Sequence, residues 1–381
     1  MSAEFIPFNK PYFTDQALTN IASAINSGKL ASEGHYSQHC QNWLQTQTQC
    51  PHVILTQSCT AALEMTALLL DLNPGDEVIM PSFTFVSTAN AFALRGAVPV
   101  FVDITPSTLT LDAEKLEAAI SPKTKAICVV HYAGVACDMD AIKAIAKQHK
   151  LIIIEDAAQS IMAKYKGEML GTLGDLGTYS FHDTKNITSG QGGALLVNTP
   201  DYMERAEILS SKGTDRHKFL RKAVDKYTWQ DLGSSYALGQ IPAALLADQL
   251  ENAETITKNR MSAWDIYHSA LISLENKGLI RRPIIPKHCD INGHMYFILL
   301  APHLNRAKII HQLALKNIQA TFHYIPLHTS PAGEKYGRVS GDMTQTDLLS
   351  STLLRLPLWV GLTPEQQGRI VQELENILKE A

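Results

Sequence analysis

The 381-residue sequence lacks several features that mark large classes of proteins. It contains no CxxC pair and no HExxH motif, and its six cysteines are scattered, which argues against a zinc site. No apolar run approaches the roughly 18 residues that a membrane helix needs, and the N-terminus does not resemble a secretory leader. We therefore expect reduced cysteines, no metal, no membrane segment and a cytoplasmic location.

Excess charge and nucleotide-binding motifs are also missing. Lys and Arg total 33 and Asp and Glu total 37, so the net charge of −4 provides no broad attraction for nucleic acid. GQGGAL departs from GxGxxG at its last position, and GxxxxGK[ST] does not occur, which disfavours a dehydrogenase or other nucleotide-binding module. The sequence favours a small-molecule ligand that is recognised by local groups.

From residue 52 onward, the sequence alternates short β-rich runs with helical stretches. HVILT, DEVIMPS, VPVFVDI, KAICVVHYAG and LIIIEDAA are typical of parallel strands buried on both faces. LGTYSF and GGALLVN would extend the sheet, and the pattern allows one antiparallel strand among them. A long helical stretch begins near residue 240, and a strand, HMYFILLA, and two helices follow it, the last with Thr363 as N-cap. We expect a large α/β domain over residues 1–250 and a smaller C-terminal α+β domain over residues 251–381.

Polar residues follow the predicted strands at the edge where an open α/β sheet binds its ligands. LIIIEDAAQ ends in Glu155 and Asp156, and such carboxylates need a cation, for example a protonated pyridine nitrogen, or backbone amides at the next helix start. LTQSCTAALEM runs from a strand into a helix whose free N–H groups suit a phosphate. An ordinary N-cap at Ser58 or Thr60 is the alternative for that stretch.

Two further stretches extend this pattern. In PSFTFVSTANA, Phe83 and Phe85 point the same way if the segment is extended, so one ring is placed to stack on a flat ligand, with core packing as the alternative. In SFHDTKNITSGQGG, Lys185 is either a solvated loop charge or, in a desolvated crevice, a nucleophile for an aldehyde. A carboxylate, a helix start, an aromatic ring and a lysine together indicate pyridoxal 5'-phosphate (PLP).

At these residues the chain resembles the DegT/DnrJ/EryC1/StrS family of sugar aminotransferases. The stretches that carry the resemblance follow in the expected order along nearly the whole chain: IPFNKPYF, SGKLASEGHYSQHCQNWL, GDEVIMPSFTFVSTANAFALRGA, HYAGVACDMD, EDAAQS, SFHDTKN and FHYIPLH. The resemblance implies an α/β protein of the PLP-dependent transferase fold type I, like aspartate aminotransferase, with a mixed, mostly parallel sheet in the large domain. It also implies a homodimer whose active sites lie at the interface.

The resemblance further implies how the cofactor is held. Lys185 is expected to be the Schiff-base lysine and proton carrier, and Asp156 the partner of the pyridinium nitrogen. The other expected cofactor contacts are Gln159 at the ring hydroxyl, Phe85 and Ala158 on the two ring faces, and Cys59, Thr60 and Ser180 at the phosphate. Cys59-Thr60 stands where the family more often has Gly-Thr. Ser235 stands where the family usually has an asparagine that reaches the neighbouring subunit's phosphate site.

The substrate contacts that we expect are Arg216, His323 and Tyr324. Arg216 lies in the basic run KGTDRHKFLRK, a candidate clamp for a diphosphate, for which a solvated charged face is the alternative. His323 and Tyr324 belong to HYIPLH, which resembles the family segment near the sugar and is otherwise a strand ended by Pro326.

The resemblance also implies a reaction. An amino group from L-glutamate would pass to the 4-keto group of dTDP-4-keto-6-deoxy-D-glucose, and we expect a dTDP-4-amino-4,6-dideoxy sugar of galactose configuration as the product. The product would serve a surface polysaccharide such as lipopolysaccharide O-antigen or enterobacterial common antigen. A 3-keto or UDP-linked keto sugar and a non-catalytic regulator with the PLP fold stay open. Relatives that dehydrate sugars carry histidine in place of the lysine, so Lys185 argues against dehydration.

Overall fold

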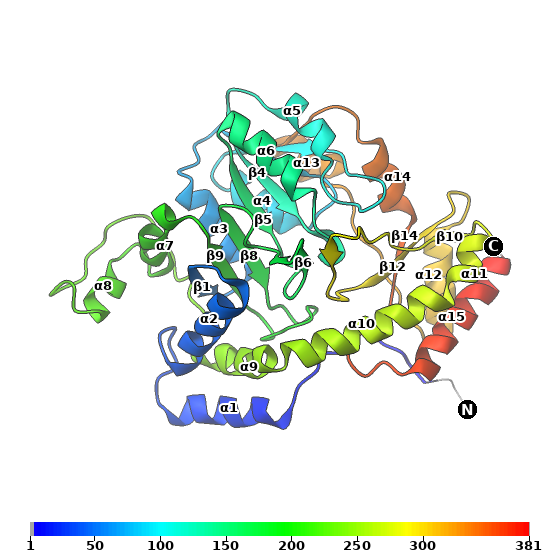
Figure 1. Ribbon diagram of the computed structural model, residues 1–381, viewed down its shortest axis with the longest axis horizontal. Coiled ribbons are helices and arrows are strands. Elements are labelled where there is room, and N and C mark those ends of the chain that lie inside the picture. The colour runs from blue at the N-terminus through cyan, green and yellow to red at the C-terminus, as the bar shows by residue number, and fades with distance from the viewer. Residues whose placement is uncertain (1–3, 381) are drawn as a thin grey trace.

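The computed structural model describes residues 4–380, and its centre is an eight-stranded sheet in the order β1-β9-β8-β5-β4-β2-β3-β13 (Figure 1). Its strands are β1 (His52–Thr56), β2 (Glu77–Pro81), β3 (Val98–Val102), β4 (Thr124–Val130), β5 (Ile152–Asp156), β8 (Leu176–Ser180), β9 (Gly193–Val197) and β13 (Arg338–Val339). β9 is antiparallel to its neighbours β1 and β8, and the other pairs are parallel. The predicted strands of this sheet, including the antiparallel one, are confirmed.

Helices cover both faces of the large sheet because its strands are apolar on both sides. Val78 and Met80 of β2 pack in one cluster with the helices α3, α4 and α7, whereas Ile79 packs in the opposite cluster with α5 and α6. Successive side chains of a strand point to opposite faces, so a strand buried on both faces appears as a continuous apolar run. These helices are α3 (Cys59–Leu69), α4 (Val86–Ala93), α5 (Leu116–Ala119), α6 (Met139–His149) and α7 (Met203–Ser210).

Two smaller sheets lie beside the large one. One has the order β10-β12-β14 and the other β11-β6-β7. Their strands are β6 (Lys164–Tyr165), β7 (Glu168–Met169), β10 (Ile280–Arg281), β11 (Cys289–Asp290), β12 (Tyr296–Leu300) and β14 (Leu353–Leu356). The predicted strand HMYFILLA is thus β12, which pairs with β14 along the register Tyr296 to Leu356.

The remaining helices include the long stretch predicted after residue 240, which is divided into three. The break between the first two falls at Asn252 (φ −96°, ψ 7°), and the next at Leu271 (φ −90°, ψ 1°). The last helix begins after Thr363, whose hydroxyl accepts a hydrogen bond from the Gln366 N–H at 3.2 Å, which confirms the predicted cap. These helices are α1 (Asp15–Asn26), α2 (His35–Thr48), α8 (Arg216–Leu220), α9 (Gln240–Glu251), α10 (Ala253–Ala270), α11 (Ile272–Asn276), α12 (Arg306–Leu315), α13 (Pro331–Tyr336), α14 (Thr344–Thr352) and α15 (Pro364–Lys379), and short 3₁₀ turns occupy Ala113–Lys115, Tyr132–Gly134, Pro200–Tyr202 and Leu327–Thr329.

The C-terminal third has its own apolar cluster around β12 and β14, and Ile6 near the N-terminus packs into it. Conversely, β13 lies at the edge of the large sheet. The division into residues 1–250 and 251–381 stays a prediction.

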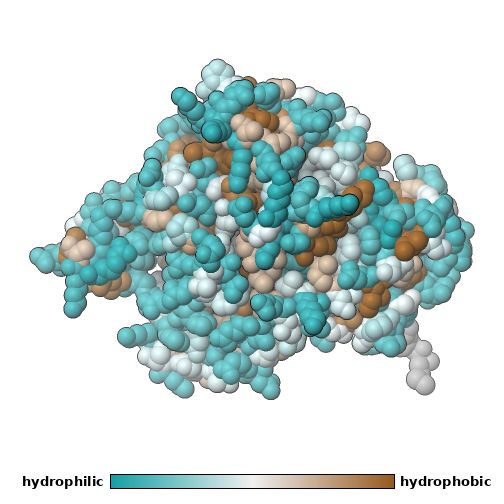
Figure 2. All heavy atoms as spheres, viewed as in Figure 1, coloured by the Kyte–Doolittle hydropathy of each residue, from teal (hydrophilic) through white to brown (hydrophobic). Residues whose placement is uncertain are grey.

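The face in Figure 2 is mainly hydrophilic with scattered hydrophobic patches. Within residues 4–380, no helix is both long enough and apolar enough to cross a membrane.

Candidate active site

A cavity of about 470 Å³ lies beyond the carboxyl ends of the central parallel strands. Val130 at the end of β4, Asp156 at the end of β5 and Ser180 at the end of β8 line it. Parallel strands bring their carboxyl ends to one edge, which is why residues far apart in sequence meet there. The predicted site residues that line this cavity are Cys59, Thr60, Phe85, Asp156, Ala158, Gln159, Ser180, Lys185, His323 and Tyr324.

The Asp156 carboxylate is held by two hydrogen bonds. Its Oδ2 accepts from the Thr88 hydroxyl at 2.6 Å, and its Oδ1 accepts from the Ala158 N–H at 3.2 Å. Thr88 lies on α4 and is fully buried, and its hydroxyl oxygen is 2.8 Å from that of Thr84, which lines the cavity. Because the Thr88 hydroxyl donates to Asp156, it accepts from the Thr84 hydroxyl. The two hydroxyl groups together hold the Asp156 carboxylate in place.

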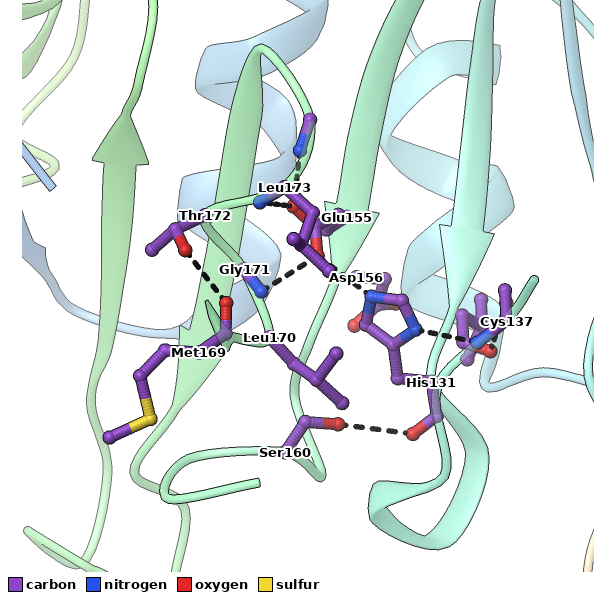
Figure 3. Close-up of polar contacts among 12 residues, drawn as sticks. His131, Cys137, Glu155, Asp156, Ser160, Met169, Leu170, Gly171, Thr172 and Leu173 are labelled. Atoms are coloured by element: carbon purple, nitrogen blue, oxygen red, sulfur yellow. Dashed lines mark hydrogen bonds and ion pairs between the residues drawn. The ribbon is translucent and has the colours of Figure 1, made fainter. Parts of the chain in front are cut away.

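Glu155, the neighbour of Asp156, is fully buried and has a separate role (Figure 3). Its two oxygens accept the backbone N–H groups of Gly171, Leu173 and Gly174 at 2.5–2.7 Å. The His131 Nδ1 accepts the Cys137 N–H at 3.2 Å, so the His131 Nε2 carries the proton and donates to Glu155 at 2.8 Å. Glu155 therefore fastens the loop before β8 to the end of β4. Backbone amides do satisfy this carboxylate, but they belong to that loop and not to a helix start as the alternative supposed.

Lys185 lies in the loop that follows β8 and lines the cavity. Burial lowers the pKa of Lys185 below its ordinary value, and the positive charge of Arg355 lowers it further, opposed by Asp156. The next residue anchors the loop: the Asn186 Nδ2 donates to the Asn292 carbonyl at 2.9 Å, and its Oδ1 lies 2.9 Å from the His294 Nδ1. A desolvated lysine of lowered pKa is the form that attacks an aldehyde, and the solvated-charge alternative does not apply.

The start of α3 faces the cavity as predicted. Ser58 is its N-cap and accepts the Ala61 N–H at 3.0 Å, so the N-cap alternative holds for Ser58. Cys59 and Thr60 are the first helical residues and line the cavity. Gly193 lets β9 pass this helix start, since a Cβ there would lie 2.4 Å from the Cys59 backbone nitrogen. Burial raises the pKa of the Cys59 thiol, so it is protonated and is a weak donor.

The prediction that Phe83 and Phe85 point the same way if the segment is extended does not hold, because the segment bends. The Thr84 N–H bonds to the Ser82 carbonyl at 3.1 Å, and α4 begins directly after Phe85. Phe83 is 1% exposed and packs edge-on against Tyr132 and Tyr324, whereas Phe85 is 57% exposed and lines the cavity. Core packing therefore describes Phe83, and only Phe85 is available to a ligand.

Gln159 and Tyr324 are joined to each other. The Gln159 Oε1 accepts the Ala133 N–H at 2.6 Å, and its Nε2 donates to the Tyr324 hydroxyl at 2.9 Å. The His323 ring stacks on Tyr324 with 3.9 Å between the ring centroids. Residues 322–326 form no strand, so the alternative of a strand ended by Pro326 does not apply.

Sequence reasoning missed Arg355, Thr88 and His294. Arg355 lies on β14 and lines the cavity, and its Nη1 donates to the His323 Nε2. The signal for Arg355 was a charged residue inside the apolar run STLLRLPLW, since a charge in a buried strand needs a reason. Thr88 and His294 carry no comparable signal, because a buried threonine or histidine is common in any core.

Ser235 and Arg216 lie outside the cavity of this chain. Ser235 is exposed, and its carbonyl accepts from the Gln57 Nε2 at 2.7 Å. The Arg216 guanidinium pairs with Glu33 at 2.8 Å, at the start of α8, in a segment that projects from the body of the molecule (Figure 1). Their predicted roles at the phosphate and diphosphate stay predictions.

The cavity fits PLP in the chemistry of its donors. It combines the Asp156 carboxylate, which Thr88 holds in place, with Lys185, whose pKa is lowered. The start of α3 adds hydroxyl and thiol groups, and Phe85 adds an exposed ring. Among residues 4–380, no group of three or more His, Cys, Asp or Glu side chains is placed to hold a metal ion.

Comparison with known proteins assigns the family. The model of the DegT/DnrJ/EryC1/StrS aminotransferase family matches residues 11–375. The chain is 32% identical to the spore coat polysaccharide biosynthesis protein SpsC of Bacillus subtilis, over 99% of this chain and 98% of that protein. It is 34% identical to the GDP-perosamine synthase of Caulobacter vibrioides, over 86% of each chain. The structure also resembles that of the sugar aminotransferase Spr1654 of Streptococcus pneumoniae in its PLP form, with a TM-score of 0.91 and 25% identity. That match covers 99% of each chain. The chain therefore belongs to the DegT/DnrJ/EryC1/StrS aminotransferase family and is a PLP-dependent aminotransferase of fold type I.

Proposed function

We propose that this aminotransferase moves the amino group of L-glutamate to the 4-keto group of a nucleotide-linked 4-keto-6-deoxy sugar in the cytoplasm. The proposed substrate is dTDP-4-keto-6-deoxy-D-glucose and the product is dTDP-4-amino-4,6-dideoxygalactose, for a surface polysaccharide. The observation that carries the chemistry is that Lys185 and Asp156, from separate segments, line one cavity. The names of two relatives, a GDP-perosamine synthase and a spore coat polysaccharide protein, support a nucleotide sugar and a surface polymer.

The side chains of the cavity divide the work. When bound, PLP supplies the carbonyl carbon that takes the amino group and a ring that accepts electrons. Asp156 is the group that would hold the ring nitrogen protonated, and Thr88 keeps its carboxylate in place. Lys185 carries a proton between the substrate carbon and the cofactor, which its lowered pKa permits. Cys59, Thr60 and Ser180 would hold the phosphate, Phe85 and Ala158 the ring faces, and Gln159 the ring hydroxyl.

The sugar side of the site includes Tyr324 and, in our proposal, residues of a second subunit. We propose a homodimer because the segment around α8 projects from the body (Figure 1) and carries exposed apolar side chains. Trp229 is 76% exposed and Leu232 is 52% exposed in this segment. Such side chains are typical of a surface that another chain covers. In that dimer, Ser235 and Arg216 would approach the phosphate and the diphosphate of the neighbouring site.

Product identification tests the proposal. The purified protein is incubated with L-glutamate and dTDP-4-keto-6-deoxy-D-glucose, and the product is analysed by NMR. We expect an amino group on C4 in the galactose configuration, with 2-oxoglutarate released in equal amount. Amination of a 3-keto isomer or of a UDP-linked sugar instead would replace the substrate while leaving the chemistry intact. A protein that binds PLP and aminates none of these would be a regulator.

A further inference from the structure

His294 is a neutral histidine with one ring nitrogen unused. The Asn186 Nδ2 donates to the Asn292 carbonyl at 2.9 Å, so the Asn186 Oδ1 is the atom that meets the His294 Nδ1, also at 2.9 Å. An amide oxygen only accepts, so the His294 Nδ1 carries the ring proton and the Nε2 carries a lone pair. Burial, and then the charge of Lys185, lower the pKa of His294 well below its ordinary value, which keeps the ring in this form near neutral pH.

The unused nitrogen opens on the cavity. His294 is 5% exposed and lines it. Among residues 4–380, the His294 Nε2 forms no hydrogen bond, and it is not sealed from solvent. The same is true of the Lys185 amino group, which has neither a hydrogen bond nor an ion pair in that part of the chain. The cavity therefore contains a free acceptor and a free donor.

The backbone fixes the position of His294. Its N–H donates to the Asn292 Oδ1 at 3.1 Å, and its carbonyl accepts from the Arg260 Nη2 at 2.7 Å. Asn292 is itself anchored, because its Nδ2 donates to the Gln159 carbonyl at 2.9 Å. The bond from the ring to Asn186 then stops the imidazole from turning. The Nε2 lone pair therefore has one direction, whereas a lysine side chain is flexible and can come to meet it.

Lys185 is the cation that is left to use this acceptor. After burial, the charge of Lys185 lowers the pKa of His294 most, and Arg260, Arg355 and His323 follow. The Arg260 guanidinium is occupied by backbone carbonyls, and Arg355 donates to His323. Lys185 is also joined to His294 through the next residue of the chain, whose side chain accepts from the ring.

We propose that the His294 Nε2 accepts a hydrogen bond from the Lys185 amino group whenever that group is free of the cofactor, and that it aims the amine at the substrate carbon. The inference rests on Lys185 as the proposed proton carrier. In that role the amine takes a proton from C2 of the bound amino acid, becomes an ammonium and delivers a proton to the cofactor carbon. His294 neither gains nor loses a proton. As a positioning residue, it holds the amine by one N–H, so that the lone pair of the amine faces the substrate.

Two amide substitutions separate the two ring nitrogens. In His294→Asn, the amide lies near the place of Nδ1 and can still donate to Asn186, but no acceptor reaches the place of Nε2. In His294→Gln, the amide extends to the place of Nε2 and can accept from Lys185, but the bond to Asn186 is lost. We expect His294→Asn to be the slower variant and His294→Gln to keep more of the rate. The opposite order would mean that the ring only anchors the loop, and the inference would be wrong.

Stopped-flow kinetics of the two half-reactions measures the effect. In His294→Asn, the maximal rate with L-glutamate, seen as loss of the PLP absorption, should fall by about 10- to 100-fold. The Kd for L-glutamate should change by less than about threefold, because His294 does not bind the donor. Deuterium at C2 of L-glutamate should slow the variant more than the wild-type enzyme, since proton transfer has become the slow step.

The sugar half-reaction should respond in the same way. Amination of a keto sugar by the enzyme loaded with pyridoxamine phosphate should slow by a similar factor in His294→Asn, because Lys185 carries the proton in both directions. A loss confined to the sugar step would mean that His294 binds the sugar. A loss confined to the Kd for L-glutamate would mean that it binds the donor. Either result overturns the inference.

The apoenzyme supplies a readout that needs no turnover. Acetic anhydride reacts with the uncharged amine, so acetylation of Lys185 against pH, followed by peptide mass spectrometry, reports its pKa. An acceptor stabilises the ammonium more than the amine, so His294→Asn should move the profile to lower pH, and His294→Gln should move it less. Cys59, Asp156 and Arg355 also act on this pKa, and both variants leave them in place. An unchanged profile in His294→Asn would contradict the proposal.

The matched control is His268→Asn. The His268 Nδ1 lies 3.3 Å from the Tyr296 hydroxyl oxygen, and the side chain does not line the cavity, so this variant should keep both half-reactions and the Lys185 profile. The proposed function fails separately. If the wild-type enzyme reacts with L-glutamate but aminates no 4-keto sugar, the proposed substrate is wrong and the role of His294 stands. If Lys185→Ala keeps both half-reactions, Lys185 is not the proton carrier, and the inference falls with that premise.

Discussion

The hydrogen bond from Thr88 to Asp156 allows a sharp test of how the site is held. The Thr88 side chain is fully buried, and Thr88→Val keeps its shape while a methyl group replaces the hydroxyl. The Asp156 Oδ2 then loses its 2.6 Å donor, and the Thr84 hydroxyl loses its 2.8 Å partner. A hydrogen bond to a charged group contributes about 1.5–3 kcal/mol, so we expect the apoenzyme to lose that much free energy of unfolding.

The same change should weaken cofactor binding. Without Thr88, the Asp156 carboxylate is free to turn away from the position in which it would meet the ring nitrogen of PLP. We expect the Kd for PLP, measured by titrating the apoenzyme and following visible absorption, to rise by about 10-fold or more. Urea unfolding of the apoenzyme gives the change in stability.

Thr66→Val is the matched control for this experiment. Thr66 is also fully buried in a helix, but its hydroxyl donates to the Leu63 carbonyl at 2.7 Å and contacts no carboxylate among residues 4–380. Its loss should cost about 1 kcal/mol of stability and leave PLP affinity unchanged. Equal PLP affinity in Thr88→Val and Thr66→Val would refute the view that Thr88 positions Asp156.

Three other predictions follow from the site. Lys185→Ala should abolish amino transfer and the covalent attachment of PLP after borohydride reduction, as seen by mass spectrometry; activity that persists would remove Lys185 from the mechanism. Glu155→Gln should lower the free energy of unfolding by about 3 kcal/mol, because an amide cannot accept all the backbone N–H groups now bound; an unchanged urea midpoint would contradict this. Burial, and then the charge of Arg355, lower the pKa of Lys185, so Arg355→Gln should raise that pKa and move the pH profile of PLP uptake by the apoenzyme upward; an unmoved profile would count against the coupling.

The sheet was predictable from the sequence because its strands are buried on both faces. Val78, Ile79 and Met80 are all fully buried, and such a strand has the same apolar appearance whatever helices cover it. The break of the long helix at Asn252 was not predictable, since no Gly or Pro marks it and good helix formers flank it. Helix propensities along the sequence favoured one continuous helix, whereas the packing of the folded molecule interrupts it.

The residues at the strand ends were more predictable than Arg355 for a physical reason. Asp156 ends the buried strand β5, and Lys185 lies in the loop that follows the buried strand β8, so the sheet itself carries them to one edge. Arg355 lies in the middle of β14, in a different sheet, and reaches the cavity only because that sheet packs beside the large one. Phe83 and Phe85 show the same limit, because a bend at Ser82 separates two rings that a period of two would align.

Two histidines of the cavity, His294 and His323, do not set its charge, although histidine is the side chain that usually titrates near neutral pH. Burial and the cations Lys185 and Arg355 lower the pKa of His294 and of His323 well below the ordinary value. The hydrogen bonds agree with neutral rings, because the His323 Nε2 accepts from Arg355 and the His294 Nδ1 donates to Asn186. His294 and His323 therefore add no charge to the cavity near neutral pH, the range in which an ordinary histidine titrates.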